Sequence, residues 1–348
     1  MNNIDYNNIH PNFKWNGVSL DKNGLLAFAD DFIKGGQEFE RITGEFILHW
    51  FDSNSFVTIH TSGTTGIPKK INIDKQAMVF SALATAEFFD LKAGNHVLNC
   101  LSTNYIAGKM MLIRSIVLGF EMDFVEPTSN PLKNNAKVYD FVAMVPLQVE
   151  NSIKELINVR KLIIGGAKIN ENLRNQLLKI PTLVYETYGM TETITHVAAK
   201  KISNNYFSVL PNVAISIDDR NCLVIDVPRI SKSKIITNDV VNIINNLEFE
   251  LLGRIDNVIN SAGVKLFPEQ IEMKLANKIH SRFFVIGIPD DQYGEQLALV
   301  IEGKPIVYES SFFNDLSPYE KPKTIHFVPN FLETVSGKVK RKATLNLI

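Results

Sequence analysis

The sequence predicts an α/β protein with a largely parallel sheet, followed by a smaller domain. In the middle of the chain, "KVYDFVAMVP" (137–146) and "VRKLIIGGAK" (159–168) are typical of buried strands, and "LQVENSIKELIN" (147–158) between them is typical of a helix. Strand, helix and strand in succession favour parallel pairing, which collects the loops at one edge of the sheet. The length of 348 residues also exceeds the roughly 250 to 300 residues at which a single core stops growing. Two domains are therefore expected.

The flanking segments extend this pattern. Residues 74–91 carry apolar side chains at helical spacing, and "HVLNCL" (96–101) is a short strand candidate. After residues 209–230 the chain changes to short β-rich pieces separated by turns, which predicts a small barrel or sheet, a β-barrel-like part of the large domain. The last ninety or so residues combine turns, strands and a helix in an α+β pattern. We place the boundary near Asp256, with a large domain over 1–255 and a small one over 256–348.

Composition narrows the classes of partner. The formal net charge is -1, which provides no electrostatic footprint for nucleic acid or an anionic membrane, so small molecules are the expected partners. Cys100 and Cys222 fit no metal or redox spacing. The first residues lack a signal-peptide pattern, and no apolar run reaches the roughly 18 residues of a membrane span, so a cytoplasmic location is expected. The sequence leaves the oligomeric state open.

A polar loop, "TIHTSGTTGIPKKI" (58–71), follows an apolar, β-prone segment. It offers backbone N–H groups, hydroxyls and two glycines that allow close approach of a ligand, a combination that suits phosphate oxygens. The Walker A pattern is absent, and a polar hairpin turn would use the same residue types. From the loop alone, a phosphate-binding loop and a polar hairpin turn both stay open as interpretations.

Four further segments occur in a fixed order after this loop: "YETYGMTETITH" (185–196), "IITNDVV" (235–241), "GRIDNVINSAGVKLFPEQIE" (253–272) and "TVSGKVKRKA" (334–343). Taken singly, each is typical of a solvated surface loop. Together with the loop at 58–71 they resemble the acyl-adenylate-forming superfamily of acyl-CoA synthetases, adenylation domains and luciferases. The resemblance covers most of the chain and implies an ATP-dependent ligase that activates a carboxylic acid as its acyl-adenylate.

The resemblance implies a role for each motif residue in ATP binding. Tyr188 would lie against adenine in the loop with Gly189, and Asp239 would accept the ribose hydroxyls with help from Arg254. Thr191 would reach the α-phosphate and Glu192 would hold Mg2+, as carboxylates commonly do beside phosphate oxygens. The junction of the adenine and acyl pockets would be lined by Gly165, Gly166 and Ala167. The β- and γ-phosphates would be clamped by the loop residues Thr61, Ser62, Gly63, Thr64, Thr65, Gly66 and Lys69.

The resemblance also implies two half-reactions. Lys338 would touch the reacting carboxylate and the α-phosphate during adenylation, offsetting the repulsion between two anions. Asp256 would be the hinge about which a mobile C-terminal domain rotates, to present the loop around Gly263 for thioester formation. CoA would then be the second substrate, with Lys265 as a contact to its phosphates.

The acyl pocket departs from the family pattern. In "NYIAGKMMLIR" (104–114), Tyr105 occupies a position where family members often carry histidine, and Lys109 follows Gly108. Within the superfamily, this segment and "TYGMTETITHVA" most resemble the o-succinylbenzoate:CoA ligases of menaquinone biosynthesis. Tyr105, Lys109, Thr195 and His196 are therefore predicted to contact the acid. Another aryl or acyl acid ligase, or an adenylating enzyme that loads a carrier protein, remains an alternative.

Overall fold

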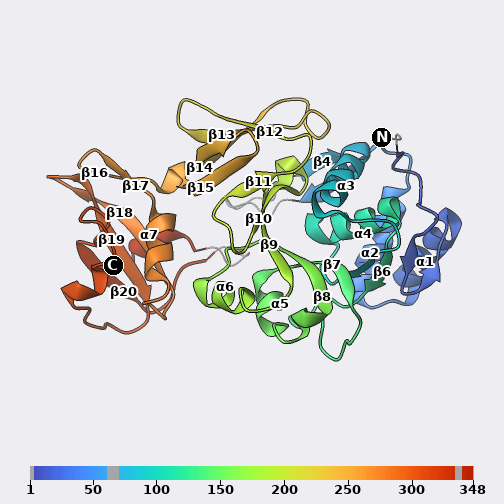
Figure 1. Cartoon of the computed structure of the whole chain (residues 1–348), viewed down its shortest axis with the longest axis horizontal. Helices are drawn as coiled ribbons and strands as arrows, with labels where there is room; N and C mark the ends of the chain where they lie inside the picture. Colours follow the sequence, from blue (N-terminus) through green and yellow to red (C-terminus); the bar gives the residue numbers. More distant parts are fainter. Residues whose placement is uncertain (1–3, 61–69, 334–338, 348) are drawn as a thin grey trace.

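The structure is a computed structural model that describes residues 4–60, 70–333 and 339–347. Its centre is a mixed sheet of thirteen strands, drawn in Figure 1 from blue to yellow. One half is parallel, as the alternating pattern predicts, with an antiparallel edge strand β2 (Val18–Ser19). From that edge the parallel strands follow in the order β1 (Lys14–Trp15), β6 (Glu121–Phe124), β5 (His96–Asn99), β7 (Tyr139–Met144), β8 (Val159–Ile164) and β9 (Leu183–Gly189).

The other half of the sheet is antiparallel. It continues from β9 through β10 (His196–Lys201), β11 (Phe207–Val209), β15 (Glu248–Arg254), β14 (Ile235–Asn245), β13 (Cys222–Asp226) and β12 (Ala214–Ile217). Within the described residues β12 pairs only with β13, so no barrel closes. Of the two arrangements predicted for this β-rich part, a small barrel or a sheet, the structure has an open extension of the main sheet.

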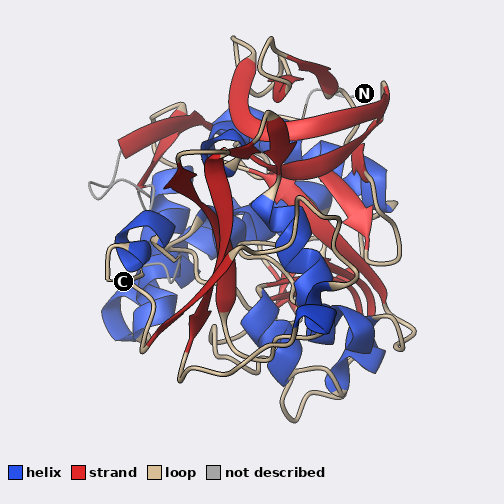
Figure 2. Ribbon diagram, turned by 90° about the vertical axis from the view of Figure 1, so that its left-hand side faces the viewer, coloured by secondary structure: helices blue, strands red, loops and turns tan. Residues whose placement is uncertain are grey.

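Helices cover both faces of the parallel half, as Figure 2 shows in blue around the red strands. The helices are α1 (Lys22–Gly35), α2 (Glu38–Trp50), α3 (Lys75–Phe89), α4 (Ile106–Leu118), α5 (Pro146–Asn151) and α6 (Glu171–Leu177). Side chains alternate along a strand, and accordingly Val97 and Phe141 belong to the core under α1–α4 while Leu98 and Val142 belong to the core under α5 and α6. Because each of these strands is buried against a core on both faces of the sheet, its residues are apolar throughout.

Helix α3 illustrates how local signals set the boundaries. The Asp74 carboxylate accepts a hydrogen bond from the Ala77 N–H at 2.8 Å, which caps the first turn, and Asp90 ends the helix in the left-handed region with φ of 46°. A short hairpin of β3 (Phe56–His60) and β4 (Lys70–Asp74) precedes the helix. The predicted helix at 147–158 is divided into α5 and a 3-10 turn at Glu155–Asn158.

The chain beyond β15 forms a second sheet, at the orange-to-red end of Figure 1. Its members are β16 (Ile259–Ser261), β17 (Val264–Leu266), β18 (Phe283–Asp290), β19 (Gly294–Glu302) and β20 (Thr324–Val328), with α7 (Pro268–Leu275), a 3-10 turn at Ser310–Phe313 and α8 (Arg341–Leu345). A core of its own, drawn from residues between 259 and 316, fills this unit. The boundary near Asp256 and the mobility of this unit stay predictions.

Within the described ranges, none of the helices combines the length and the apolar composition that a membrane span needs.

Candidate active site

The carboxyl ends of β7, β8 and β9 open on a cavity of about 280 Å3. The start of α4 and the segment between β9 and β10 complete its walls. Parallel sheets collect their binding loops at this edge, and the cavity brings together six of the predicted site residues: Gly165, Gly166, Gly189, Thr191, Thr195 and His196.

The backbone at this edge is tightly constrained. A Cβ added at Gly189 would lie 2.3 Å from the Thr195 carbonyl oxygen, so only glycine allows the two chain segments to approach this closely. Gly166 has a φ of +85°, which a side chain would also disfavour. Ile194, buried in the cavity wall, has a φ of +66°, a rare conformation for a β-branched residue that costs on the order of 1–3 kcal/mol.

Hydrogen bonds within the loop hold Ile194 in this conformation. Its N–H donates to the Thr191 carbonyl at 2.9 Å, and the Thr193 hydroxyl accepts from the Met190 N–H at 2.9 Å and lies 2.7 Å from the Thr195 carbonyl oxygen, to which it can donate. The strained turn directs Thr195 and His196 to the cavity wall. Such strain is often found where a binding site must be rigid before its ligand arrives.

A cation that the motifs did not indicate lies in this cavity. Arg114 of α4 is 1% exposed and lines the cavity together with Thr191 and Gly165. Its Nη2 donates to the Thr195 hydroxyl at 3.5 Å, and its Nε has no hydrogen-bond partner in the described part of the chain. Burial lowers the pKa of the guanidinium to about 9. The site thus contains a buried positive charge without a carboxylate beside it among the described ion pairs.

The sequence carried one signal for Arg114. It stands in the run "IAGKMMLIRSIVL", which is otherwise almost free of charge and forms a helix whose residues are mostly buried. Charged residues are rarely fully buried unless they are paired, so an arginine in such a helix is a candidate functional residue.

His196 lines the same cavity and is held as a neutral imidazole. Its Nε2 lies 3.3 Å from the Thr85 hydroxyl and its Nδ1 lies 3.4 Å from the Thr195 hydroxyl. Burial, followed by the charge of Arg114, lowers the pKa of His196 well below its ordinary value. At neutral pH the imidazole is therefore a hydrogen-bonding group and carries no charge.

Two of the residues predicted to contact the acid lie elsewhere. Tyr105 is 67% exposed before the first turn of α4, and Lys109 is buried but not in the cavity wall. The Lys109 ammonium donates to the Thr103 carbonyl and lies 4.7 Å from the centre of the Phe46 ring. Neither Tyr105 nor Lys109 lines the cavity in the structure. The contact of these two residues with the acid stays a prediction from the sequence alone.

The buried ammonium of Lys109 should make stability depend on pH. Burial lowers its pKa from 10.5 to about 8, so the folded protein releases this proton before the unfolded chain does. Between pH 8 and 10.5 the unfolded state binds more protons, and the free energy of unfolding should rise with pH by up to about 3 kcal/mol from this group. Urea denaturation at pH 7.5 and 10 should show a larger rise for the wild type than for Lys109→Met. Equal rises would contradict the burial of an ammonium without a counter-ion among the described ion pairs.

A second cluster lies beside the cavity, where β14 and β15 pair with Asp239 directly opposite Arg254. The Tyr188 hydroxyl donates to the Asp239 carboxylate at 2.6 Å, and the Arg254 guanidinium donates to the same carboxylate at 3.3 Å. Burial and the charge of Asp239 raise the pKa of Tyr188 above its usual range, so the phenol remains a donor. The Tyr188 ring packs edge-on against Phe249. Three of the predicted ATP-binding residues therefore form one hydrogen-bonded group.

The remaining predicted residues are distributed along the same edge and beyond it. Glu192 is exposed in the 3-10 turn at Thr191–Thr193, and Ala167 is exposed after Gly166. Asp256 accepts a hydrogen bond from Arg254 at 2.9 Å, within the 3-10 turn at Ile255–Asn257. Gly263, with φ of +82°, lies in the turn between β16 and β17, and Lys265 is exposed on β17. The loop residues Thr61 to Lys69, and Lys338, lie outside the described residues.

Comparison with known proteins assigns the family. The AMP-binding enzyme family matches residues 47–228, more than half of the chain. The chain belongs to this family. Among solved structures, an acyl-CoA synthetase (AMP-forming)/AMP-acid ligase II-like protein from Dyadobacter fermentans is 34% identical, with a TM-score of 0.63 over 92% of this chain and 97% of that one. The predicted membership of the acyl-adenylate-forming ligases is confirmed.

More distant relatives carry a more specific name. The 2-succinylbenzoate–CoA ligases of Listeria monocytogenes and Haemophilus influenzae are 24% and 25% identical, over 85% and 81% of this chain and 71% and 68% of theirs. The o-succinylbenzoate CoA synthetase of Bacillus subtilis, solved with its acyl-adenylate intermediate, is 19% identical with a TM-score of 0.71 over 82% of this chain and 68% of its own. At this identity the structural match shows the α/β fold of the AMP-binding family.

Proposed function

We propose that this AMP-binding ligase joins a small dicarboxylic acid, o-succinylbenzoate or a close analogue, to CoA through an acyl-adenylate. The observation that carries the proposal is the buried guanidinium of Arg114 in the wall of the cavity, beside Thr195 and His196. The names of the distant relatives point to the same acid.

A second carboxylate on the acid would account for the guanidinium of Arg114 in the cavity wall. A buried charge is costly unless a counter-ion and hydrogen bonds meet it, and an arginine can bind a carboxylate through two parallel N–H donors. The Arg114 Nη2 lies 3.5 Å from the Thr195 hydroxyl of the cavity wall and could supply one of them, whereas Nε is enclosed by the protein and has no partner in the described structure. With a fatty acid in the cavity, whose only carboxylate is the reacting one, the guanidinium would stay unpaired.

The size of the cavity supports a small acid. Its 280 Å3 lies near the lower end of the roughly 300–1,000 Å3 that small-molecule sites occupy. Ile106, Met144 and Ile163 line it together with the polar groups, so an aromatic ring has apolar contacts while the charged end meets Arg114. The other carboxylate would then face Thr191, another residue of the cavity wall.

ATP, Mg2+ and CoA complete the proposed reaction. Asp239 and Arg254 offer an acceptor and a donor for the ribose hydroxyls, next to Tyr188 for the adenine. No group of three metal-binding side chains occurs within the described ranges. This fits Mg2+, which is commonly held by one or two carboxylates and the phosphates of the substrate, and Glu192 is the candidate carboxylate. Gly263 and Lys265 are the candidates for CoA.

A panel of carboxylic acids tests this proposal. Pyrophosphate release and thioester formation would be measured with o-succinylbenzoate, the analogue without the ring carboxylate, and a long-chain fatty acid, each with and without CoA. We expect the diacid to give the highest kcat/KM and to yield a thioester. Pyrophosphate release without a thioester would favour loading of a carrier protein, and a preference for the fatty acid would overturn the choice of substrate.

A further inference from the structure

We propose that Thr85, on helix α3, is a positioning residue for the substrate carboxylate. It fixes the tautomer of His196 and thereby the direction of the Thr195 hydroxyl, which accepts a hydrogen bond from Arg114 Nη2. This inference rests on the proposed role of Arg114 in binding a carboxylate. Thr85 lies outside every motif of the sequence analysis, and it is fully buried within α3.

The direction of the hydrogen bonds starts at the backbone of α3. The Thr85 hydroxyl lies 2.9 Å from the Ser81 carbonyl oxygen. A carbonyl can only accept, so the single proton of the Thr85 hydroxyl is donated there. In its contact of 3.3 Å with His196 Nε2, Thr85 must therefore accept. The imidazole nitrogen at this position carries the proton.

The tautomer of His196 then decides the next two contacts. A neutral imidazole has one N–H, so with Nε2 protonated, Nδ1 is an acceptor. The Thr195 hydroxyl at 3.4 Å donates to it, which leaves a lone pair of Thr195 to accept from Arg114 Nη2 at 3.5 Å. The four contacts are mutually compatible in one direction only, with each donor pointing from Arg114 toward the Ser81 carbonyl.

The alternative tautomer, with the proton on Nδ1, would mismatch the hydrogen bonds of His196 with Thr195 and with Thr85. With the proton on Nδ1, the Thr195 hydroxyl would have to accept from His196 and from Arg114, and its own proton would need another partner. His196 Nε2 would also face the oxygen of Thr85, whose proton is already used. Thr85 is thus the group that selects between the two tautomers.

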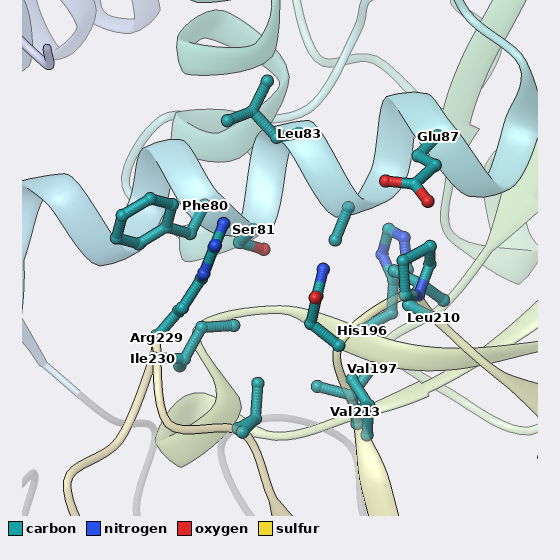
Figure 3. Close-up of a pocket in the computed structure, with 14 residues that line it drawn as sticks. Phe80, Ser81, Leu83, Glu87, His196, Val197, Leu210, Val213, Arg229 and Ile230 are labelled. Atoms are coloured by element: carbon teal, nitrogen blue, oxygen red, sulfur yellow. The ribbon is translucent and has the colours of Figure 1, made fainter. Parts of the chain in front are cut away.

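Packing prevents His196 from escaping this choice by rotation. On its α3 side the imidazole borders a cavity of only about 20 Å3, shown in Figure 3, which is room for roughly one water molecule. Leu210 and Val213 close this space, and the Phe89 ring lies 6.0 Å from the imidazole. His196 is consequently a rigid link between α3 and the larger cavity that contains Arg114.

The test removes the acceptor at Thr85 and keeps its shape. Thr85→Val should raise KM for the diacid roughly fivefold to tenfold, the amount expected for one buried hydrogen bond, with little change for the analogue without the ring carboxylate. Thr85→Ser should restore the wild-type KM because it retains the hydroxyl. Ser81→Ala is the matched control: it removes a hydroxyl one turn earlier on α3 that has no partner among the described side chains.

A direct readout keeps the proposal testable even if Thr85→Val fails to fold. The 15N shifts of His196 in the wild-type protein, assigned with His196→Gln, should show a protonated Nε2 and an unprotonated Nδ1. In Thr85→Val the fraction with Nδ1 protonated should rise. An Nδ1–H tautomer in the wild type would overturn the proposal.

The outcomes separate this inference from the proposed function. If the wild type prefers the diacid and Arg114→Met abolishes that preference, while Thr85→Val behaves as Ser81→Ala does, Thr85 has no positioning role and the function stands. If the wild type shows no preference for the diacid, the proposed function fails, and the positioning role that rests on it fails with it.

Discussion

Replacing Arg114 with methionine should lower kcat/KM for the dicarboxylic acid by roughly thirtyfold or more. Removing one partner of a buried, hydrogen-bonded charge pair costs about 2–5 kcal/mol, and 1.4 kcal/mol corresponds to about a tenfold change. The guanidinium is almost completely buried and its Nε is unpaired in the described structure, so the carboxylate would lose its counter-ion inside a low-dielectric cavity. Methionine keeps the unbranched shape, and steady-state kinetics with pyrophosphate detection would measure the loss.

Two controls make this result specific. The analogue without the ring carboxylate should lose little, because it has no second carboxylate to pair with Arg114. Lys109→Met removes a second buried cation from the same helix, whose ammonium lies beside Phe46 and outside the cavity, and should affect both acids equally. Selective damage by Lys109→Met, with Arg114→Met harmless, would instead support the prediction made from the sequence.

Arg114→Lys would separate charge from geometry. A lysine keeps the positive charge but lacks the planar pair of donors that matches a carboxylate. We expect part of the diacid activity to remain, with a higher KM. Full activity would indicate that only charge matters at this position.

Helical phase explains why the sequence analysis named Lys109 and missed Arg114. The two residues are five positions apart on α4, so on a helix of 3.6 residues per turn they lie about 140° apart. Ala107, two turns before Arg114, lines the cavity as well. The sequence shows the helix, but which of its sides faces the cavity depends on how α4 packs against α3 and the sheet.

Secondary-structure elements, which local patterns of sequence determine, were predicted more completely than the side-chain contacts of the site. The strands at 139–144 and 159–164 and the helix at 75–89 follow from apolar periodicity and caps, which short stretches of chain contain. The motif residues after parallel strands meet at one edge because the topology requires it, as Gly165, Gly189 and Thr191 do. The pairing of Tyr188 with Asp239 joins residues 51 positions apart, and no local pattern indicates that distance. The same limit applies to β10–β15, whose short strands are compatible with either a barrel or an open sheet.

The largest expected effect is that of Lys338→Ala on adenylation. The resemblance to the family assigns Lys338 to the reacting carboxylate and the α-phosphate. At an effective dielectric constant near 20, a positive charge about 4 Å from a negative one is worth roughly 4 kcal/mol, or on the order of a thousandfold in rate if realised only in the transition state. Pyrophosphate release should therefore almost disappear, whereas supplied acyl-adenylate and CoA should still give thioester. Lys340→Ala, an exposed member of the same basic run, is the matched control and should leave both rates unchanged.

Asp256→Pro should have the opposite effect if Asp256 is the hinge. Proline fixes φ near -65°, which would hinder rotation of the smaller unit and slow thioester formation more than adenylation. Asp256→Ala separates the backbone from the side chain, because it removes the carboxylate that accepts from Arg254 at 2.9 Å and leaves φ free. Only the proline variant should uncouple the two half-reactions. If Lys338→Ala and Asp256→Pro reduced both half-reactions to the same extent, the chain would not use two orientations of its C-terminal unit.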